Sequence, residues 1–295
     1  MTVVVLGDVM VDVVARVEAP LAHGSDTAAR IALTGGGSAA NTAAWLAYAG
    51  VPVALVARVG DDTAGRDELA DLREAGVELR VAVDATRSTG TCIVIVDAAG
   101  ERTMLPDRGA NLALSPADVD LTGASHLHVS GYALLHPAPR AAALAALEAA
   151  RAAGVPTSVD PSSTAPLRAL GADAFIRLVA GVGLLVPNAD EAAVLTGERD
   201  PVAAARALAR ATGADVVVTC GAAGAVHSGG QHAAATPQPV VNTTGAGDAF
   251  TAGLIAARLR GAGDAEALAA GNALAADALA LTGARPPRDE VSPMR

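Results

Sequence analysis

The chain contains few aromatic residues, few cysteines and fewer basic than acidic residues. Aromatic residues make up 2% of its 295 positions and hydrophobic residues 52%, so the core must consist mainly of Ala, Val and Leu. Ala-rich segments favour helices and Val-rich segments favour strands. The 21 basic and 31 acidic residues give a net charge of −10, and no basic stripe is evident. This balance argues against a nucleic-acid partner.

Three further absences bear on where the protein is found. No apolar run is long enough to span a bilayer, so no membrane association is expected. Residues 1–6, Met-Thr-Val-Val-Val-Leu, lack the basic region and cleavage site of a secretory signal and predict a first strand. Cys92 and Cys220 match no metal-ligand spacing and are expected to be reduced, packed thiols. These features together predict a soluble cytoplasmic protein.

Short apolar runs alternate with Ala-rich helical stretches along the chain. The expected strands occupy residues 3–6, 53–58, 126–129, 157–159, 183–186 and 215–219. The expected helices occupy residues 39–48, 65–74, 140–153, 190–195, 201–211 and 249–259. This alternation is typical of a mainly parallel sheet that is covered by helices on both faces.

Two β-rich segments interrupt this alternation, at residues 9–33 and 87–105. In the second, residues 91–97 and 101–105 flank an Ala-Ala-Gly turn and predict a hairpin. The two segments together predict a small β-sheet lid over the strand ends, where ligands of parallel sheets bind. The rest of the chain, 1–8, 34–86 and 106–295, would then form the main nucleotide- and substrate-binding domain.

The most informative segment is Asn-Thr-Thr-Gly-Ala-Gly-Asp-Ala-Phe, which ends at Phe250. Backbone N–H groups at the start of a predicted helix can bind an anion without a cationic side chain, here those of Gly245, Ala246 and Gly247. Asp248 would repel a phosphate bound there, which makes sense if its carboxylate accepts a proton from an attacking hydroxyl. Alternatively, Thr244 or Asp248 only caps the helix. The segment alone does not separate these interpretations.

A second glycine cluster, Thr-Gly-Gly-Gly-Ser-Ala-Ala-Asn, ends at Asn41. Its glycines would let a polar ligand lie against the backbone, and Asn41 offers a donor and an acceptor. The cluster differs from the dinucleotide-binding and P-loop motifs, and a flexible turn is the alternative. Asp12 lies in an apolar stretch and needs a partner, either substrate hydroxyls or the water around a lid turn. Asp8 is interpreted as a turn or cap residue.

Three further places in the chain could contact a nucleotide. Asn188 and Glu191 have the spacing of a capping box, which is the interpretation favoured by the residues alone, although both could reach Mg²⁺-bound water or phosphate. Asn272 lies in an Ala-rich helix, either exposed or against an adenine edge. A predicted strand is followed by three small residues that could admit a nucleotide: Thr219, Gly221 and Gly224. The alternative is an ordinary turn, where such glycines are common.

The ordered set of motifs resembles the PfkB carbohydrate kinase family, also called ribokinase-like, over essentially the whole chain. Residues 35–43 resemble the N-terminal motif of the family and residues 243–250 its C-terminal motif, while the motifs at Asn188 and Thr219 match at intermediate positions. The resemblance implies a three-layer α/β/α fold with a mainly parallel central sheet. It also implies a small β-sheet lid that can form a homodimer interface.

The resemblance also implies transfer of the γ-phosphoryl group of MgATP to a primary hydroxyl of a sugar or sugar derivative. Asp248 would be the catalytic base, beside an anion hole formed by Gly245, Ala246 and Gly247. The substrate-binding residues would be Asp12, Gly36, Gly37 and Asn41, with Arg108 returning from the lid. The ATP-binding residues would be Asn188, Thr219, Gly221, Gly224 and Asn272. Glu191 would organise Mg²⁺ through water.

Two departures from the family pattern narrow these expectations. Asn242 and Pro287 stand where many potassium-activated members carry Asp and a small polar residue, which argues against a monovalent-cation site. Ribokinases carry a Glu after the strand at 126–129, whereas this chain continues Ser-Gly-Tyr, which argues against ribose as the substrate. Tyr132 could line the pocket at this point. Arg108 would suit an acidic sugar, although a solvated loop arginine is the alternative.

Three functions are compared. A sugar kinase is the first choice, and a nucleoside kinase of the adenosine, inosine or pseudouridine type is the alternative on the same scaffold. A nucleoside would need an apolar slot for its base, and the scarcity of aromatics argues against base stacking. A catalytically idle nucleotide or sugar sensor is disfavoured, because a sensor has no need of Asp248.

Overall fold

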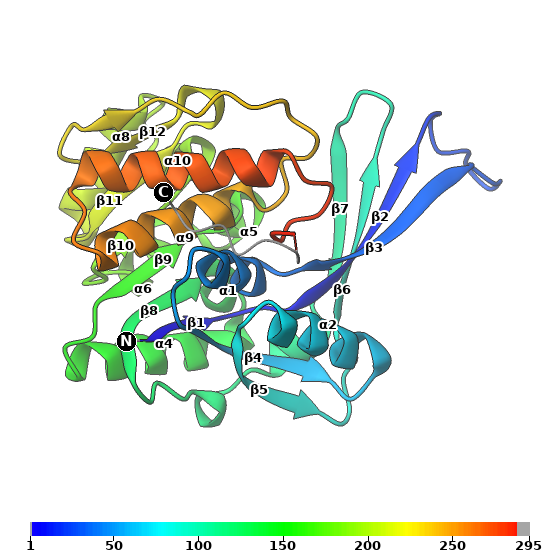
Figure 1. The fold of residues 1–295 in the computed structure, drawn as a ribbon, viewed down its shortest axis with the longest axis horizontal. Helices are drawn as coiled ribbons and strands as arrows, with labels where there is room; N and C mark the ends of the chain where they lie inside the picture. The colour runs from blue at the N-terminus through cyan, green and yellow to red at the C-terminus, as the bar shows by residue number, and fades with distance from the viewer. Residues whose placement is uncertain (1, 288–295) are drawn as a thin grey trace.

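The computed structural model describes residues 2–287, which form a large and a small β-sheet with helices around the large one (Figure 1). The large sheet has the order β13-β12-β11-β10-β9-β8-β1-β4-β5, and all neighbours from β11 to β5 are parallel. Its strands are β1 (Thr2–Leu6), β4 (Val53–Gly60), β5 (Glu78–Asp84), β8 (Ala124–Ser130), β9 (Thr157–Asp160), β10 (Leu184–Leu185), β11 (Asp215–Thr219), β12 (Ala225–His227) and β13 (His232–Ala233).

Helices cover both faces of the large sheet. One face packs against α1 (Ser38–Tyr48), α2 (Thr63–Glu74), α9 (Ala246–Leu259) and α10 (Asp264–Leu279). The other packs against α3 (Gly131–Leu135), α4 (Pro137–Ala152), α5 (Thr164–Leu170), α6 (Ala172–Leu178), α7 (Ala189–Thr196) and α8 (Pro201–Thr212). Val3 and Val5 of β1 join the first core and Val4 and Leu6 the second, because successive strand residues point to opposite faces. The predicted α/β/α fold is confirmed.

The predicted strands and helices are all present, and their ends shift by a few residues. One of these shifts affects the site. Helix α9 begins at Ala246 rather than at residue 249, which places Asp248 in its first turn. Strand β5, with the sequence Glu-Leu-Arg-Val-Ala-Val-Asp, was not expected, because its exposed and half-buried residues give no continuous apolar run. Short 3₁₀ turns occur at Gly109–Ala113, Pro116–Asp118 and Gly221–Ala223.

The small sheet stands beside the main domain in Figure 1 and has the order β3-β2-β6-β7. Its strands are β2 (Met10–Val17), β3 (Ala29–Gly36), β6 (Gly90–Val96) and β7 (Arg102–Asp107). Strands β6 and β7 pair antiparallel, which confirms the predicted hairpin, and β2 pairs parallel with β6. The register aligns Asp12, Cys92 and Pro106 in one row, on the face directed toward the main domain.

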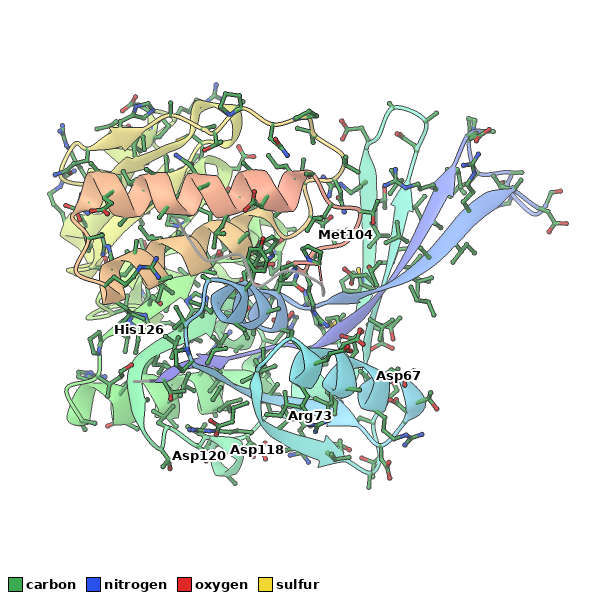
Figure 2. All side chains as sticks on the ribbon, viewed as in Figure 1. Asp67, Arg73, Met104, Asp118, Asp120 and His126 are labelled. Carbon is green, nitrogen blue, oxygen red and sulfur yellow. The ribbon has the colours of Figure 1, made fainter. Side chains whose placement is uncertain are left out.

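His126 and His128 lie on one face of β8, as the strand alternation predicts (Figure 2 labels His126). Their ring nitrogens share the hydroxyl of Ser158, at 2.8 and 2.9 Å. Burial lowers the pKa of His126 to about 4 and that of His128 to about 3, so both rings are neutral at pH 7. Cys92 and Cys220 are both free thiols. Within residues 2–287, no helix is long and apolar enough to cross a membrane.

Candidate active site

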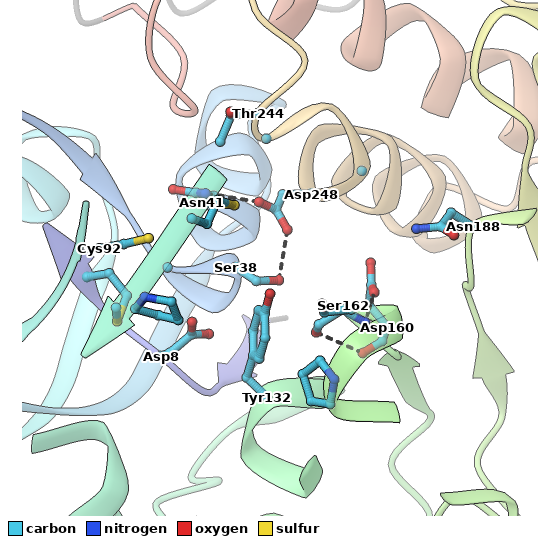
Figure 3. A pocket seen from close by; sticks show the side chains of 18 of the residues that line it. Asp8, Ser38, Asn41, Cys92, Tyr132, Asp160, Ser162, Asn188, Thr244 and Asp248 are labelled. Atoms are coloured by element: carbon cyan, nitrogen blue, oxygen red, sulfur yellow. Dashed lines mark hydrogen bonds between the residues drawn. The ribbon is translucent and has the colours of Figure 1, made fainter. Parts of the chain in front are cut away.

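A cavity of about 520 Å³ opens between the large sheet and the small sheet (Figure 3). Five parallel strands of the large sheet, β1, β8, β9, β10 and β11, are each followed or ended by a lining residue: Asp8, Tyr132, Asp160, Asn188 and Thr219. The small sheet contributes Met10, Asp12, Cys92, Met104 and Pro106. The carboxyl ends of parallel strands are where ligands of open α/β sheets bind, so the cavity occupies the expected place.

Asp248 is held in this cavity by two residues of α1. Ser38 Oγ donates a hydrogen bond to Oδ1 at 2.8 Å, and Asn41 Nδ2 donates one to Oδ2 at 2.9 Å (Figure 3). No side chain within the described residues caps α9, so the alternative that Thr244 or Asp248 serves as its cap is not observed. Because a carboxylate has about four lone-pair sites, Asp248 keeps the capacity to accept a proton.

The surroundings of Asp248 favour its protonated form. Burial raises the pKa of this carboxyl to about 8; the nearby carboxylates of Asp160 and Asp8 add to the rise, whereas the hydrogen bonds from Asn41 and Ser38 oppose it. A carboxylate with a raised pKa is a stronger base than an exposed one. The site therefore suits proton transfer near neutral pH.

The glycines before Asp248 shape the N-terminus of α9. Gly245 adopts a left-handed conformation with φ of 82°, and a Cβ atom there would lie 2.4 Å from the carbonyl oxygen of Ala284. Only glycine fits such a position without strain. The first N–H groups of a helix have no partner within it, and Gly245 and Gly247 line the cavity. This arrangement can bind a phosphate group.

Each glycine of the early triple-glycine run admits a different close neighbour. A Cβ on Gly35 would lie 2.2 Å from Nη1 of Arg285, and one on Gly36 would lie 2.4 Å from Oδ1 of Asp12. Gly37 has φ of 89°, and a Cβ there would lie 2.5 Å from the carbonyl oxygen of Asp8. The run is thus a tightly occupied turn rather than the flexible one that the sequence left open.

The small-sheet end of the cavity carries two carboxylates and one arginine. Arg108 forms an ion pair with Asp8 at 3.3 Å, and its guanidinium lies 3.7 Å from the centre of the Tyr132 ring. Burial raises the pKa of Asp12 to about 6, against the opposing charges of Arg285 and Arg108. The predicted pocket position of Tyr132 is confirmed.

Asp8 has more partners than a turn residue. It accepts a hydrogen bond from the backbone N–H of Ala39 at 3.3 Å, as a cap at the start of α1 would, and another from Ser130 Oγ at 3.2 Å. It is also 4% exposed and lines the cavity. Sequence reasoning missed this role, although the position directly after β1, four residues before Asp12, was a usable signal.

At the other end, Asn188 and Glu191 form the predicted capping box. Asn188 Oδ1 accepts from the N–H of Glu191 at 2.9 Å, and Glu191 Oε2 accepts from the N–H of Asn188 at 3.0 Å. Asp160, which the sequence analysis did not single out, faces them from the end of β9. Burial, and for Glu191 the neighbouring charge of Asp160, raises the pKa of both carboxyls. Carboxylates held so near one another suit a divalent cation.

The remaining predicted nucleotide-side residues are distributed around Thr219, which lines the cavity beside Asn188. Gly221 and Gly224 follow it, and a Cβ on Gly224 would lie 2.0 Å from the carbonyl oxygen of Ala233. Asn272 Nδ2 donates to the carbonyl oxygens of Ala233 and Ala234, at 3.0 and 2.9 Å. Gly221, Gly224 and Asn272 do not line the cavity, so their contact with a nucleotide stays a prediction.

The fold and the site together define a phosphoryl-transfer enzyme of the α/β class. The sequence pattern of the pfkB family carbohydrate kinases matches residues 1–290, so the chain belongs to this family. The chain is 36% identical to a fructokinase of Klebsiella pneumoniae, over 85% of this chain and 82% of that protein. It is 35% identical to an ATP-dependent ribose-1-phosphate kinase of Halopiger xanaduensis, over 95% and 92%. It is therefore a phosphotransferase with an alcohol acceptor.

Solved structures agree with this assignment. An adenosine kinase from Sinorhizobium meliloti superposes with a TM-score of 0.89 at 26% identity, covering 96% of this chain and 95% of that one. The structure of an E. coli protein assigned as ribokinase II, in complex with ATP and Mg²⁺, superposes with a TM-score of 0.86 at 25% identity, covering 96% of this chain and 94% of that one. The predicted ribokinase-like fold is confirmed.

Proposed function

We propose that the chain transfers the γ-phosphoryl group of MgATP to a primary hydroxyl of a neutral sugar. The observation that carries this proposal is the position of Asp248. Its carboxylate lies in the same cavity as the N-terminus of α9 and as the polar groups of Asp12 and Asn41. A phosphate at the helix terminus and a hydroxyl at the small-sheet end would both be next to it.

The chemistry follows from this placement. The hydroxyl oxygen attacks the γ-phosphorus, the bond to the β–γ bridging oxygen breaks, and the hydroxyl proton passes to Asp248, leaving a sugar phosphate and ADP. A free alcohol is far too weakly acidic to lose its proton beforehand, so the transfer occurs late, as charge develops on the attacking oxygen. Asp248 then contributes roughly 10²–10⁴-fold to the rate, with alignment and the backbone N–H groups of α9 providing much of the rest.

Magnesium fits the nucleotide end of the cavity. Asp160 and Glu191 supply carboxylate oxygens and Asn188 an amide oxygen, which are ligands or water partners that Mg²⁺ prefers. Bound there, Mg²⁺ would neutralise part of the charge on the nucleotide phosphates. Asn188 and Glu191 remain oriented by their capping box, so the side chains are ordered before a cation arrives.

The charges at the small-sheet end favour an uncharged acceptor. Asp8 and Asp12 place two carboxylates there, and the ion pair with Asp8 neutralises much of the charge of Arg108. The names of the two relatives cover a sugar and a sugar phosphate, and these charges support the sugar. Carboxylates accept hydrogen bonds from sugar hydroxyls, whereas a second phosphate would be repelled.

A nucleoside kinase is the second candidate, because an adenosine kinase superposes well on this chain. A base would need an apolar or aromatic surface. Tyr132 is the aromatic residue among the cavity-lining residues, and the guanidinium of Arg108 already covers one face of its ring at 3.7 Å. This contact argues against base stacking on that face.

An ADP-release assay on a panel of acceptors tests the proposal. Neutral hexoses and pentoses, their phosphates and nucleosides would be compared with MgATP at saturation. The proposal expects the highest kcat/KM for a neutral sugar, with phosphate appearing on its primary hydroxyl by NMR. A nucleoside or a sugar phosphate as the best acceptor would contradict it, and the absence of turnover with every acceptor would exclude kinase activity on these classes.

We further propose that the small sheet, corresponding to residues 9–33 and 87–105, acts as a lid. Arg102 on β7 supports this, because its Nη1 donates to Asn242 Oδ1 at 2.9 Å and also contacts Thr244 Oγ1, in the loop that leads into α9. The sheet thus touches the phosphate-binding loop directly. A closed lid would exclude water and suppress ATP hydrolysis.

The outer face of the small sheet supports a homodimer. The register aligns an apolar row on the face opposite Asp12, formed by Leu33, Val13, Ile93 and Leu105. Leu33 is 72% exposed and Leu105 is 53% exposed. Exposed apolar surface of this kind marks an interaction site, and a second copy of the same sheet would cover it. We expect Leu33→Glu to give a monomer by analytical ultracentrifugation, and Leu144→Glu on α4 to leave a dimer; a wild-type monomer would contradict the proposal.

A monovalent-cation site is not part of the proposal. Asn242 Nδ2 donates to the carbonyl oxygen of Thr282 at 2.8 Å, and Asn242 Oδ1 accepts from the N–H of Thr244 at 3.0 Å and from Arg102. These oxygens already have hydrogen-bond donors, so a cation would have to displace them. We also propose a cytoplasmic location, where ATP is available and where free thiols such as Cys92 stay reduced.

A further inference from the structure

Arg285, in the segment after α10, lies behind the acceptor end of the cavity. Its side chain is 13% exposed. Its Nε donates to Asn41 Oδ1 at 3.3 Å, its Nη2 donates to the carbonyl oxygen of Gly36 at 2.8 Å, and Nη2 lies 2.7 Å from Glu68 Oε2 on α2. One guanidinium thus joins the C-terminal segment, the triple-glycine turn, α1 and α2.

The end of β3 separates Arg285 from Asp12. The guanidinium lies against Gly35, whereas the Asp12 carboxylate lies against Gly36. Successive residues of a strand point to opposite faces, so the two charged groups face each other across β3. A side chain on either glycine would push one of them away. The paired glycines therefore allow an arginine to approach the acceptor site from the rear.

We propose that Arg285 is a positioning residue, which fixes the carboxamide of Asn41 against Asp248 and places a positive charge behind the carboxylate of Asp12. The inference rests on the kinase function proposed above. Arg285 does not line the cavity and touches no reacting atom, so it acts through Asn41 and Asp12.

The contact with Asn41 decides which way its amide points. Asn41 Oδ1 accepts from Arg285, so Nδ2 is left to donate to Asp248 Oδ2. Without the guanidinium, the carboxamide could rotate and present an oxygen to the carboxylate, which would place two acceptors together. Asp248 would then lose a hydrogen bond that holds it, and its alignment with the acceptor hydroxyl would suffer.

The contact with Asp12 is electrostatic. The charged groups facing this carboxylate are Asp8, Arg108 and Arg285, with Glu68 behind Arg285. The Cys92 thiol, opposite Asp12 on β6, also faces it, and burial raises the pKa of this thiol, so it stays uncharged. Burial raises the pKa of Asp12 to about 6, and the charge of Arg285 opposes that rise. Removing the charge would move the pKa closer to neutral, so a larger share of Asp12 would be protonated at pH 7, and a protonated carboxyl accepts from a sugar hydroxyl more weakly than a carboxylate does.

Two substitutions separate these effects. In Arg285→Gln both the positive charge and the guanidinium fork, the Nε and Nη2 donors to Asn41 and Gly36, are lost, so we expect kcat to fall about tenfold. The acceptor KM should fall as pH rises and Asp12 ionises, and the midpoint of this fall should lie roughly one pH unit higher in the variant than in the wild type. Arg285→Lys restores the charge without the fork, so the pH dependence of KM should return to that of the wild type while kcat stays low. The acceptor is the sugar with the highest turnover in the panel, measured from pH 5 to 8.

Glu68→Gln gives a test of sign. Without the Glu68 carboxylate, the charge of Arg285 acts on Asp12 uncompensated, so the KM profile should move toward lower pH, opposite to Arg285→Gln. Arg58→Gln is the matched control, because Arg58 also forms ion pairs, with Asp84 and Asp118, but lies outside the cavity lining. It should lower Tm and leave both the KM profile and kcat unchanged.

Either of two results would overturn the inference: the Arg285 variants match Arg58→Gln in kcat and KM profile, or Glu68→Gln and Arg285→Gln shift the profile in the same direction. If Arg285→Gln does not fold, the other two variants decide the matter. We expect a low kcat for Arg285→Lys and a KM profile shifted toward lower pH for Glu68→Gln. A wild-type protein without turnover would instead refute the kinase function, so the two failures are distinct.

Discussion

The side-chain amide of Asn41 donates a hydrogen bond of 2.9 Å to Oδ2 of Asp248, joining residues that are 207 positions apart in the chain. This bond connects the two glycine-rich motifs, because Asn41 lies on the helix after the first and Asp248 on the helix within the second. It places the proposed base directly beside a residue expected to bind the acceptor.

Replacing Asn41 should impair catalysis more than ATP binding. Asn41→Leu removes a hydrogen bond to a charged group, which is worth about 1.5–3 kcal/mol, so kcat should fall by roughly 10–100-fold. The Kd for ATP, measured by calorimetry, should stay unchanged, because Asn41 lies at the acceptor side. Thr42→Val, at the next position of α1 and outside the cavity lining, is the control. A variant with normal kcat would show that the bond is dispensable.

The pH dependence of the reaction should follow the carboxyl of Asp248. Only its ionised form can accept a proton, and burial raises its pKa to about 8, so kcat/KM should increase as pH rises through 8. A divalent cation beside Asp160 and Glu191 favours ionised carboxylates, so a higher Mg²⁺ concentration should move this limb to lower pH. A profile that falls with rising pH, or that ignores Mg²⁺, would contradict the assignment.

Stability should show the opposite trend with pH. The Asp248 carboxyl has a pKa raised above its unfolded value, so its contribution to stability is complete at low pH and is lost as pH rises through 8. Tm should therefore decline from about pH 4 to about pH 8, the range between the unfolded and the folded pKa, and Asp248→Asn should flatten that decline. Equal slopes in differential scanning calorimetry for the wild type and the variant would contradict the shifted pKa.

Loss of Arg102 should uncouple ATP hydrolysis from sugar phosphorylation. Arg102→Gln removes the hydrogen bonds from the small sheet to the loop before α9, so the acceptor KM should rise about five- to tenfold. ATP hydrolysis without acceptor should increase, because the lid admits water. Arg16→Gln is the control, since Arg16 lies in the same cross-strand row as Arg102 and forms no ion pair with any residue that the structure describes. Unchanged hydrolysis in Arg102→Gln would argue against a lid.

Potassium should not activate the enzyme. The amide of Asn242 and the carbonyl of Thr282 are already hydrogen-bonded to each other, and Arg102 supplies a positive charge beside them. Turnover in KCl should therefore equal turnover in choline chloride at the same ionic strength, which controls for screening. A marked rise in kcat with KCl alone would show that a cation displaces these hydrogen bonds.

The sequence predicted the fold well because strands buried on both faces leave a clear trace. Val3-Val4-Val5-Leu6 places alternate residues in two cores, and such a run is hard to mistake. Strand β5 was missed because its half-buried residues carry a weaker pattern. The start of α9 was placed three residues late, since the glycines that precede Asp248 resemble a loop more than a helix.

Within the site, motif residues were predictable and isolated carboxylates were not. Asp248 and Asn41 belong to recognisable glycine-rich segments, whereas Asp8 and Asp160 simply lie at or just after the ends of strands, as many solvated aspartates do. Their importance comes from which strands become neighbours, and β1 and β9 are neighbours of β8 only in the folded sheet. Arg285 could not be inferred for the same reason, because its partners Asn41 and Glu68 lie more than two hundred positions earlier.

The role of Asp248 as the base is tested most directly by the turnover of Asp248→Asn, measured together with its affinity for ATP. The variant keeps the size of the side chain, but it offers one acceptor oxygen in place of two and cannot accept the hydroxyl proton. We predict that kcat falls by roughly 10²–10⁴-fold while the Kd for MgATP does not weaken. A variant that phosphorylates its sugar at a near-normal rate would show that Asp248 is not the base.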